Sequence, residues 1–226
     1  AWGLGGMRGG ADRSRTVERE RRITRGGRGV IAGCRQRGWR GTKNRRVLRE
    51  IDVRTELAAH GAAHVAVSVT TLDASLAARM EPRAASPRER LRTIRELSGA
   101  GIPVQALVAP VIPGITDREV PAILEAVRDA GATAAGWIMM RLPWGVKEVF
   151  SEWLGREFPD RARKVASLIR GMRRGELNDS RPRVRMRGAG VMAAQVTPMC
   201  NTAARRRGRD RRPRPGHSGA CRRPPR

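Results

Sequence analysis

The chain has 226 residues and a formal net charge of +26, with no tyrosine and only three cysteines. The length suits one domain with a sizeable core. Cys34, Cys200 and Cys221 are far apart and form no C-x2-C pair, which argues against a disulfide framework and a zinc site. No apolar run reaches the roughly 18 residues that a membrane span needs.

The positive charge is concentrated in the two flanks of the sequence. Residues 1–46 hold 14 Lys+Arg and 3 Asp+Glu, and residues 181–226 hold 14 and 1, whereas residues 47–180 hold 19 and 17. The first flank is rich in glycine, and residues 205–226 are an Arg/Pro/Gly tract. Because such segments cannot bury enough apolar surface to offset the entropy of ordering, we predict disordered basic termini.

The middle of the chain alternates short apolar runs with helical patterns. A strand is expected between Cys34 and Asn44, although its sequence favours strand formation poorly, and a helix is expected from Val47 to His60. Three further runs have the length and the Gly or Pro boundaries of strands buried on both faces. These predicted strands are His64–Thr71, Val104–Pro110 and Gly136–Leu142.

The helices between these strands begin at recognisable capping sequences. Ser86-Pro-Arg-Glu89 predicts a capping box with proline at the first helical position, and Thr116-Asp-Arg-Glu119 predicts a second capping box. Glycines at 61, 101 and 131 are predicted to end helices just before strands. Two amphipathic helices follow Pro143 and Pro159, and residues 181–190 are expected to be irregular.

This β-α-β-α-β order predicts an α/β fold with parallel strands and covering helices. In such folds the chemistry lies beyond the carboxyl ends of the strands. We therefore look for function in residues 68–83, 110–117 and 141–143.

Several short sequence motifs, some of them within these ranges, occur in an order that resembles radical S-adenosylmethionine (radical SAM) enzymes of the branch similar to spore photoproduct lyase. They are Thr42-Lys-Asn44, Ser68-Val-Thr-Thr-Leu-Asp73, Arg79-Met-Glu-Pro-Arg83, Ala100-Gly-Ile-Pro-Val104, Val108-Ala-Pro-Val-Ile-Pro-Gly114, Arg141-Leu-Pro143, Asn178-Asp-Ser-Arg181 and Met186-Arg-Gly188. The resemblance divides the chain into a degenerate basic segment at 1–41, a partial (β/α) barrel at 42–195 and a disordered tail at 196–226.

The resemblance implies S-adenosylmethionine as cofactor and, in the intact family, a [4Fe-4S] cluster held by C-x3-C-x2-C. That motif does not occur in this sequence, so we predict no metal ligands here. We expect a C-terminal portion of such an enzyme, with its first barrel strands missing and little catalysis alone. A missing barrel half would leave Val65 and Val67 at an open sheet edge, with a risk of aggregation.

The candidate cofactor-binding residues each have two interpretations. Hydroxyls at Ser68, Thr70 and Thr71 either bond the cofactor's ribose, as the resemblance implies, or simply favour a strand end. Glu81 and Arg83 either hold the polar end of the cofactor or form a local surface ion pair.

The segment from Val111 to Gly114 either receives an adenine or is a plain β-α turn. Arg141 needs an acidic partner, either substrate or Glu81, and Lys43 is a weaker candidate of the same kind. His60 and His64 are expected to be structural because they lie at the opposite side of the barrel.

The alternative function is non-specific nucleic-acid binding through the arginine-rich termini, which would be sensitive to salt. No aromatic residue interleaves with those arginines, so base stacking is not predicted. We expect no membrane partner and no signal peptide, and a cytoplasmic location. Possible DNA-repair-lyase-like chemistry rests on the resemblance alone.

Overall fold

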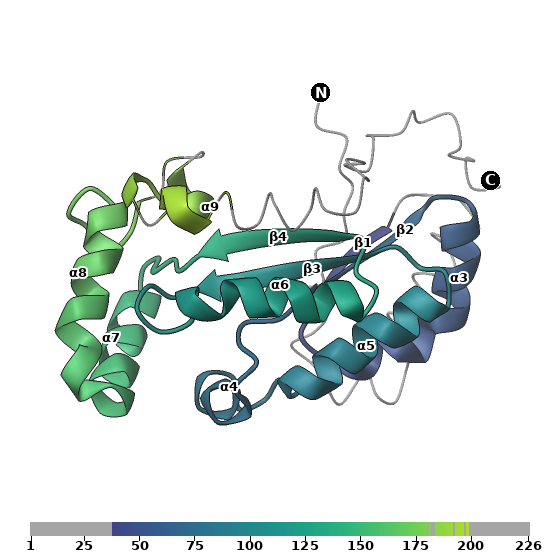
Figure 1. The fold of residues 1–226 in the computed structure, drawn as a ribbon, viewed down its shortest axis with the longest axis horizontal. Coiled ribbons are helices and arrows are strands. Elements are labelled where there is room, and N and C mark those ends of the chain that lie inside the picture. Colours follow the sequence, from purple (N-terminus) through teal and green to yellow (C-terminus); the bar gives the residue numbers. More distant parts are fainter. Residues whose placement is uncertain (1–37, 180, 182–183, 192, 197, 199–226) are drawn as a thin grey trace.

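A computed structural model describes residues 38–179, 181, 184–191, 193–196 and 198 (Figure 1). All three cysteines and most of the predicted disordered termini lie outside these residues, but Val196, assigned to the disordered tail, is buried in the core. The sheet has four parallel strands in the order β1-β2-β3-β4, as the predicted α/β fold requires. The strands are β1 (Gly38–Thr42), β2 (Ala63–Ser68), β3 (Val104–Val111) and β4 (Ala134–Met139).

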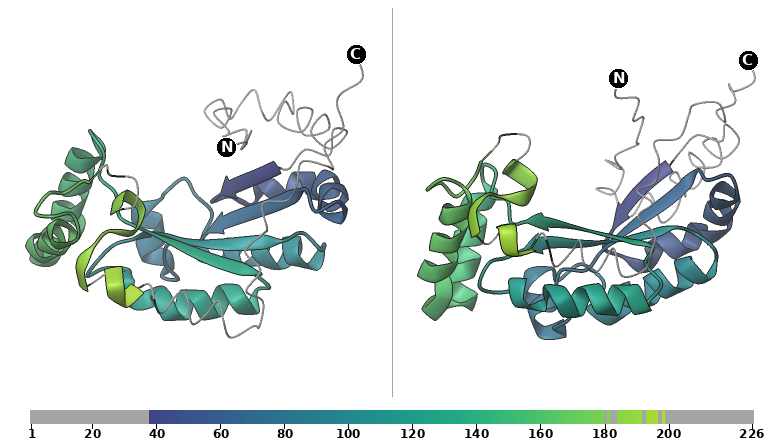
Figure 2. Two further views of the ribbon diagram at one scale, coloured as in Figure 1. Left: turned by 90° about the horizontal axis from the view of Figure 1, so that it is seen from above. Right: turned by 45° about the horizontal axis from the view of Figure 1, so that its top comes forward.

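The helices follow the strands in the predicted alternation. They are η2 (Arg45–Glu50), α3 (Ile51–Ala59), α4 (Ala74–Met80), α5 (Pro87–Gly99), η3 (Asp117–Glu119), α6 (Val120–Asp129), α7 (Val146–Glu157), η4 (Pro159–Arg161), α8 (Ala162–Met172) and α9 (Val184–Arg187). In Figure 1 the arrowheads of β3 and β4 point towards α7 and α8, while α5 and α6 run along the sheet. The views in Figure 2 show that the sheet is twisted.

Strand β1 forms although its sequence, GWRGT, has little strand propensity. It pairs in parallel with β2, from Gly38 opposite Ala63 to Thr42 opposite Val67. Backbone pairing therefore overrides local propensity here. The prediction that Val65 and Val67 face an open edge is wrong, because β1 covers β2 and both valines are buried in the core.

The main core lies between the sheet and the helices α5 and α6. Its largest contributors include Val67, Ile94, Leu97, Val104 and Ile123, each 1% exposed or less. Pro87 begins α5 at its first position, and the Ser86 side chain accepts a hydrogen bond from the Glu89 N–H at 3.3 Å. The first predicted helix start is therefore confirmed.

The second predicted capping box is wrong. The Thr116 hydroxyl does not cap the following helix; it accepts a hydrogen bond from the Ile112 N–H at 2.9 Å instead. Glu119 is bound to Thr71 at the end of β2. Both side chains thus tie loops together at the strand ends, a tertiary role that the local sequence pattern cannot reveal.

The predicted glycine stops are confirmed at Gly61, Gly101 and Gly131, which all have positive φ. Gly131 has a second reason to lack a side chain: a Cβ there would lie 2.5 Å from Oγ of Ser98. The α5 and α6 ends can approach closely only because this position is glycine.

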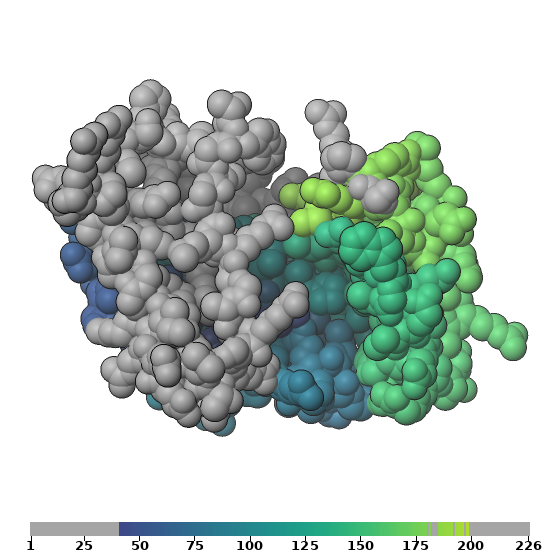
Figure 3. Space-filling model, turned by 180° about the vertical axis from the view of Figure 1, so that it is seen from behind, coloured from purple at the N-terminus to yellow at the C-terminus, as the bar shows by residue number. Residues whose placement is uncertain are grey.

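A second apolar cluster stands beyond the carboxyl ends of β3 and β4, where α7 and α8 pack together. Its most deeply buried members include Ile112, Leu142, Val165 and Ile169. From behind, the green and yellow-green residues of α7, α8 and α9 lie together on one side of the molecule (Figure 3). The expectation of wholly irregular structure at 181–190 is wrong, since α9 forms there and packs against β4.

Candidate functional site

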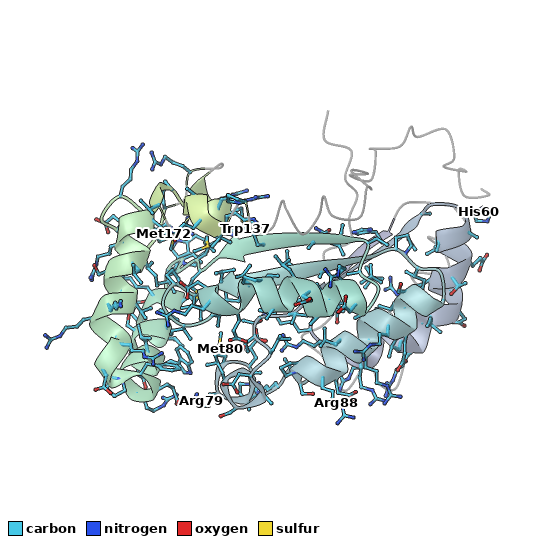
Figure 4. The ribbon with its side chains drawn as sticks, in the orientation of Figure 1. His60, Arg79, Met80, Arg88, Trp137 and Met172 are labelled. Atoms are coloured by element: carbon cyan, nitrogen blue, oxygen red, sulfur yellow. The ribbon has the colours of Figure 1, made fainter. Side chains whose placement is uncertain are left out.

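The carboxyl ends of the parallel strands share one edge of the sheet, and an ion-pair network lies at the β1–β2 part of this edge. Lys43 directly follows β1, and its ammonium group pairs with the Glu81 carboxylate. Glu81 is the residue after α4, the helix that follows β2 (Figure 4 labels the preceding Arg79 and Met80). We call Lys43, Thr70, Glu81 and Arg90 the Glu81 network.

Arg90 is the member of this network that the sequence analysis missed. It is only 2% exposed, and its Nη2 lies 2.5 Å from Oε2 of Glu81. Its other nitrogens donate to the carbonyl oxygens of Ala85 at 2.8 Å and Ser68 at 3.2 Å. Arg90 thus fastens the start of α5 to the end of β2 and holds Glu81 in place.

Glu81 is ionised in this setting. Burial would raise the pKa of its carboxyl group, but the hydrogen bonds and positive charges of Lys43 and Arg90 outweigh burial and hold that pKa below its usual range. The side chain of Glu81 is 15% exposed and that of Lys43 is 39% exposed. Lys43 is therefore accessible to solvent, whereas Arg90 is buried.

The candidate hydroxyls after β2 are buried and already bonded in part. Thr70 donates to the carbonyl of Ala109 at 3.1 Å, and its oxygen is 3.5 Å from Glu81. Thr71 donates to the carboxylate of Glu119, whose two oxygens lie 2.7 and 2.9 Å away. Ser68 is 7% exposed, and its carbonyl accepts from Arg90. The structure brings Ser68, Thr70 and Glu81 together around Arg90.

The segment after β3 is packed against α8. The Val111 side chain is fully buried, and the Val111 carbonyl accepts from the Met140 N–H at 2.8 Å. Gly114 has φ +76°, and a Cβ there would lie 3.3 Å from the Leu168 side chain. Both this turn and the close packing of α8 require glycine at position 114. The backbone of the segment is therefore the part that can contact a ligand.

Neither predicted arginine pairs with Glu81. Arg83 is exposed, and no hydrogen bond or ion pair joins it to Glu81 in the described part of the chain. Arg141 points elsewhere, with its Nη1 3.4 Å from the sulfur of Met186. Its Nε is buried and has no hydrogen-bond partner among the described residues.

A second buried arginine, Arg173, lies near Arg141 and was also missed by the sequence analysis. It follows α8, is 1% exposed, and donates from Nη2 to the carbonyl of Met140 at 3.0 Å. Burial lowers the pKa of Arg173; the charge of Asp179 opposes this effect, and the charge of Arg141 adds to it. The β4 end of the edge therefore holds two neighbouring cations.

The two histidines lie where they were expected, away from this edge. His60 is at the end of α3, at the opposite end of the molecule from α7 and α8 (Figure 4). His64 is near the start of β2 and forms a hydrogen bond of 3.2 Å with Gln105.

The residues present do not fit a [4Fe-4S] cluster. The sequence has no C-x3-C-x2-C spacing, and no group of three or more His, Cys, Asp or Glu within the described ranges could hold a metal ion. The Glu81 network does fit an amino-acid head group, because it offers an accessible ammonium beside a carboxylate. In the same ranges no helix is long and apolar enough to cross a membrane.

Comparison with known families agrees with the predicted resemblance. Residues 41–127, which include the whole Glu81 network, match the radical SAM superfamily. The resemblance to radical SAM proteins is confirmed for this segment. We call residues 41–127 the radical SAM segment.

Relatives of the chain include the uncharacterized proteins Rv2578c of Mycobacterium tuberculosis and Mb2609c of Mycobacterium bovis. Each is 29% identical over 131 residues, which cover 57% of this chain and 38% of the relative. The chain thus spans 38% of the length of these curated relatives.

Solved structures similar to this chain include spore photoproduct lyase. A complex with dinucleoside spore photoproduct and a mutant with bound AdoMet and the same ligand each show 18% identity and a TM-score of 0.46. The alignments cover 62% of this chain and 41% of the lyase chain.

Proposed function

We propose that the radical SAM segment and the strand β4 form the S-adenosylmethionine-binding part of a radical SAM-type enzyme. The observation that carries this proposal is the Glu81 network, which places an accessible lysine and an ionised carboxylate within the segment that matches the superfamily. It lies at the carboxyl end of the parallel strands, where α/β enzymes bind their ligands.

In this proposal Lys43 attracts the carboxylate of the cofactor, and Glu81 attracts its ammonium group. Ser68 and Thr70 are the residues nearest for the ribose hydroxyls, and the backbone from Val111 to Gly114 meets the adenine. Arg83, which is exposed, remains a proposed contact to the polar end. Arg141, at the other end of the edge, remains a proposed contact to substrate.

The cofactor supplies a 5′-deoxyadenosyl radical in this family when a [4Fe-4S] cluster reduces its sulfonium. This sequence contains no C-x3-C-x2-C motif for that cluster. The proposal is therefore one of cofactor binding, and we expect little or no catalysis by this chain alone.

Calorimetry with S-adenosylmethionine tests the proposal. Lys43→Gln should weaken binding about tenfold, because a charge-assisted hydrogen bond is lost. The matched control is Arg45→Gln, which removes a neighbouring cation that is 62% exposed and pairs with Glu89. The proposal fails if the unchanged protein does not bind the cofactor, or if Lys43→Gln binds it as tightly as the control does.

Nucleic-acid binding through the termini is the second candidate, favoured by the charge distribution. Residues 181–226 hold 14 Lys+Arg against 1 Asp+Glu. Affinity for a single-stranded oligonucleotide should fall steeply with added salt and drop when residues 200–226 are deleted. Cofactor binding should survive the deletion. Salt-independent affinity, or affinity that the deletion leaves unchanged, contradicts this candidate.

A further inference from the structure

The two charged groups that would hold a ligand at the Glu81 network are already paired with each other. The Lys43 ammonium group contacts Oε1 of Glu81, which has no other hydrogen-bond or ion-pair partner among the described residues. A ligand ammonium needs this same oxygen, and a ligand carboxylate needs Lys43. The Lys43–Glu81 pair must therefore open before an amino-acid head group can bind there.

The second oxygen of Glu81 has different surroundings. Oε2 lies 2.5 Å from Nη2 of Arg90 and 3.5 Å from the Thr70 hydroxyl. The Arg90 side chain is 3% exposed, whereas that of Lys43 is 39% exposed. One oxygen of the carboxylate thus contacts a buried cation, and the other contacts an accessible one. If Lys43 leaves, Arg90 still provides Glu81 with a counter-charge.

The backbone around the pair is fixed by hydrogen bonds. The Glu81 N–H donates to the carbonyl of Ala77 at 2.8 Å, and the Ala85 N–H donates to the carbonyl of Lys43 at 3.0 Å. The carbonyl of Ala85 in turn accepts from Nε of Arg90 at 2.8 Å. The part of the pair that is free to move is therefore the Lys43 side chain, whose four-carbon stem is flexible.

A purely structural role for the pair explains little. The bond between Ala85 and Lys43 already joins the end of β1 to the loop between α4 and α5. An ion pair with an accessible partner adds little to the stability of a fold, because solvent screens it. For the same reason the Lys43–Glu81 pair can be opened at small cost.

We propose that ligand binding exchanges the Lys43–Glu81 ion pair. The ammonium group of the ligand replaces Lys43 on Oε1 of Glu81, while Arg90 keeps Oε2. The released Lys43 side chain turns to the carboxylate of the ligand. This inference rests on the proposed function and concerns the selectivity of the same site.

The exchange makes the site selective for a ligand that carries both charges. A ligand with an ammonium group alone displaces Lys43 but gives it no new counter-charge. A ligand with a carboxylate alone competes with Glu81 for a single lysine. Only a zwitterionic amino-acid head group replaces the one original pair by two new pairs.

Chemical modification of lysines tests the exchange without any substitution. The chain has three lysines, Lys43, Lys147 and Lys164. Lys147 and Lys164 are exposed and form no ion pair among the described residues, so they serve as references in the same sample. Acetylation attacks an unprotonated amine, and peptide mass spectrometry follows the rate at each lysine. Because Glu81 holds the Lys43 ammonium group, Lys43 should react more slowly than the two references.

Three ligands at saturating concentration separate the steps of the exchange. Decarboxylated S-adenosylmethionine should speed up acetylation of Lys43, relative to the references, by up to about fivefold. S-Adenosylmethionine should have a smaller effect, because its carboxylate takes the released lysine. 5′-Methylthioadenosine, which has no ammonium group, should have none. If decarboxylated S-adenosylmethionine leaves the rate at Lys43 unchanged or lowers it, the exchange is overturned.

Calorimetry with the two charged ligands separates this proposal from the proposed function. Lys43→Gln removes the competitor for Glu81, so decarboxylated S-adenosylmethionine should bind it up to about fivefold more tightly than the wild type, whereas S-adenosylmethionine should bind less tightly. Arg45→Gln removes a neighbouring cation and should change neither affinity in this way. If S-adenosylmethionine binds the wild type but Lys43→Gln weakens both ligands alike, the exchange fails and cofactor binding stands. If neither ligand binds the wild type, the proposed function fails and the exchange fails with it.

Discussion

Two groups of cations lie at the same edge of the sheet, and they differ in how their charge is balanced. At the β1–β2 end, Lys43 and Arg90 share Glu81, and Arg90 uses its other donors on backbone carbonyls. At the β4 end, the charges of Arg141 and Arg173 act on each other, and the neighbouring Asp179 is bound to Arg181. The cations of the first group share a carboxylate, whereas the Nε of Arg141 in the second group has no hydrogen-bond partner among the described residues.

The largest effect that tests this contrast is expected at Glu81. Glu81→Gln leaves Arg90 buried without its counter-charge, and breaking a buried pair in this way typically costs about 3–5 kcal/mol of unfolding free energy. Urea unfolding followed by circular dichroism measures the loss. Glu125→Gln is the control, because the Glu125 side chain is 68% exposed and its pair with Arg128 lies on the surface. If Glu81→Gln lowers the unfolding free energy no more than Glu125→Gln does, Glu81 does not balance the buried charge of Arg90.

The same pair predicts how stability depends on pH. The pKa of Glu81 is lower in the folded protein than its ordinary value of 4.5, because Lys43 and Arg90 outweigh burial. The folded state therefore binds this proton less tightly than the unfolded state does, and the pair stabilises the fold fully above about pH 4.5. The contribution is lost as the pH falls through the folded pKa.

Unfolding free energies measured from neutral pH down to acid should thus fall less steeply for Glu81→Gln than for the wild type. The difference between the two proteins should narrow below about pH 4.5. A difference that stays constant over this range would mean that Glu81 titrates alike in the folded and unfolded states.

The contrast also explains what the sequence could and could not predict. The features that follow from short-range rules were predicted correctly. They are the Ser86 cap, the glycine stops and the alternation of strands and helices. Thr116 and Glu119 fit the same capping pattern, yet they bond to Ile112 and Thr71. Their partners are set by tertiary contacts, which no local pattern contains.

Arg90 and Arg173 were not predicted from the sequence either, although the sequence around Arg90 contains a usable signal. Arg90, Ile94 and Leu97 fall on one face of α5 at helical spacing, so Arg90 occupies a position in the apolar stripe. A charged residue there needs a buried partner, and this could have indicated the network. Arg173 gives no such signal, because it follows the end of α8, and its bond to Met140 joins it to the distant β4 end.

The smallest expected change in stability concerns Arg141. Arg141→Met removes a buried donor that lacks an acceptor and a charge that repels Arg173, while methionine keeps an unbranched apolar stem. The unfolding free energy should stay within about 1 kcal/mol of the wild type or rise. Arg163→Met, at an exposed position of α8, gives the baseline for removing a cation from a basic protein. A loss as large as that of Glu81→Gln would mean that Arg141 is balanced within the chain itself, and the two ends of the edge would then not differ.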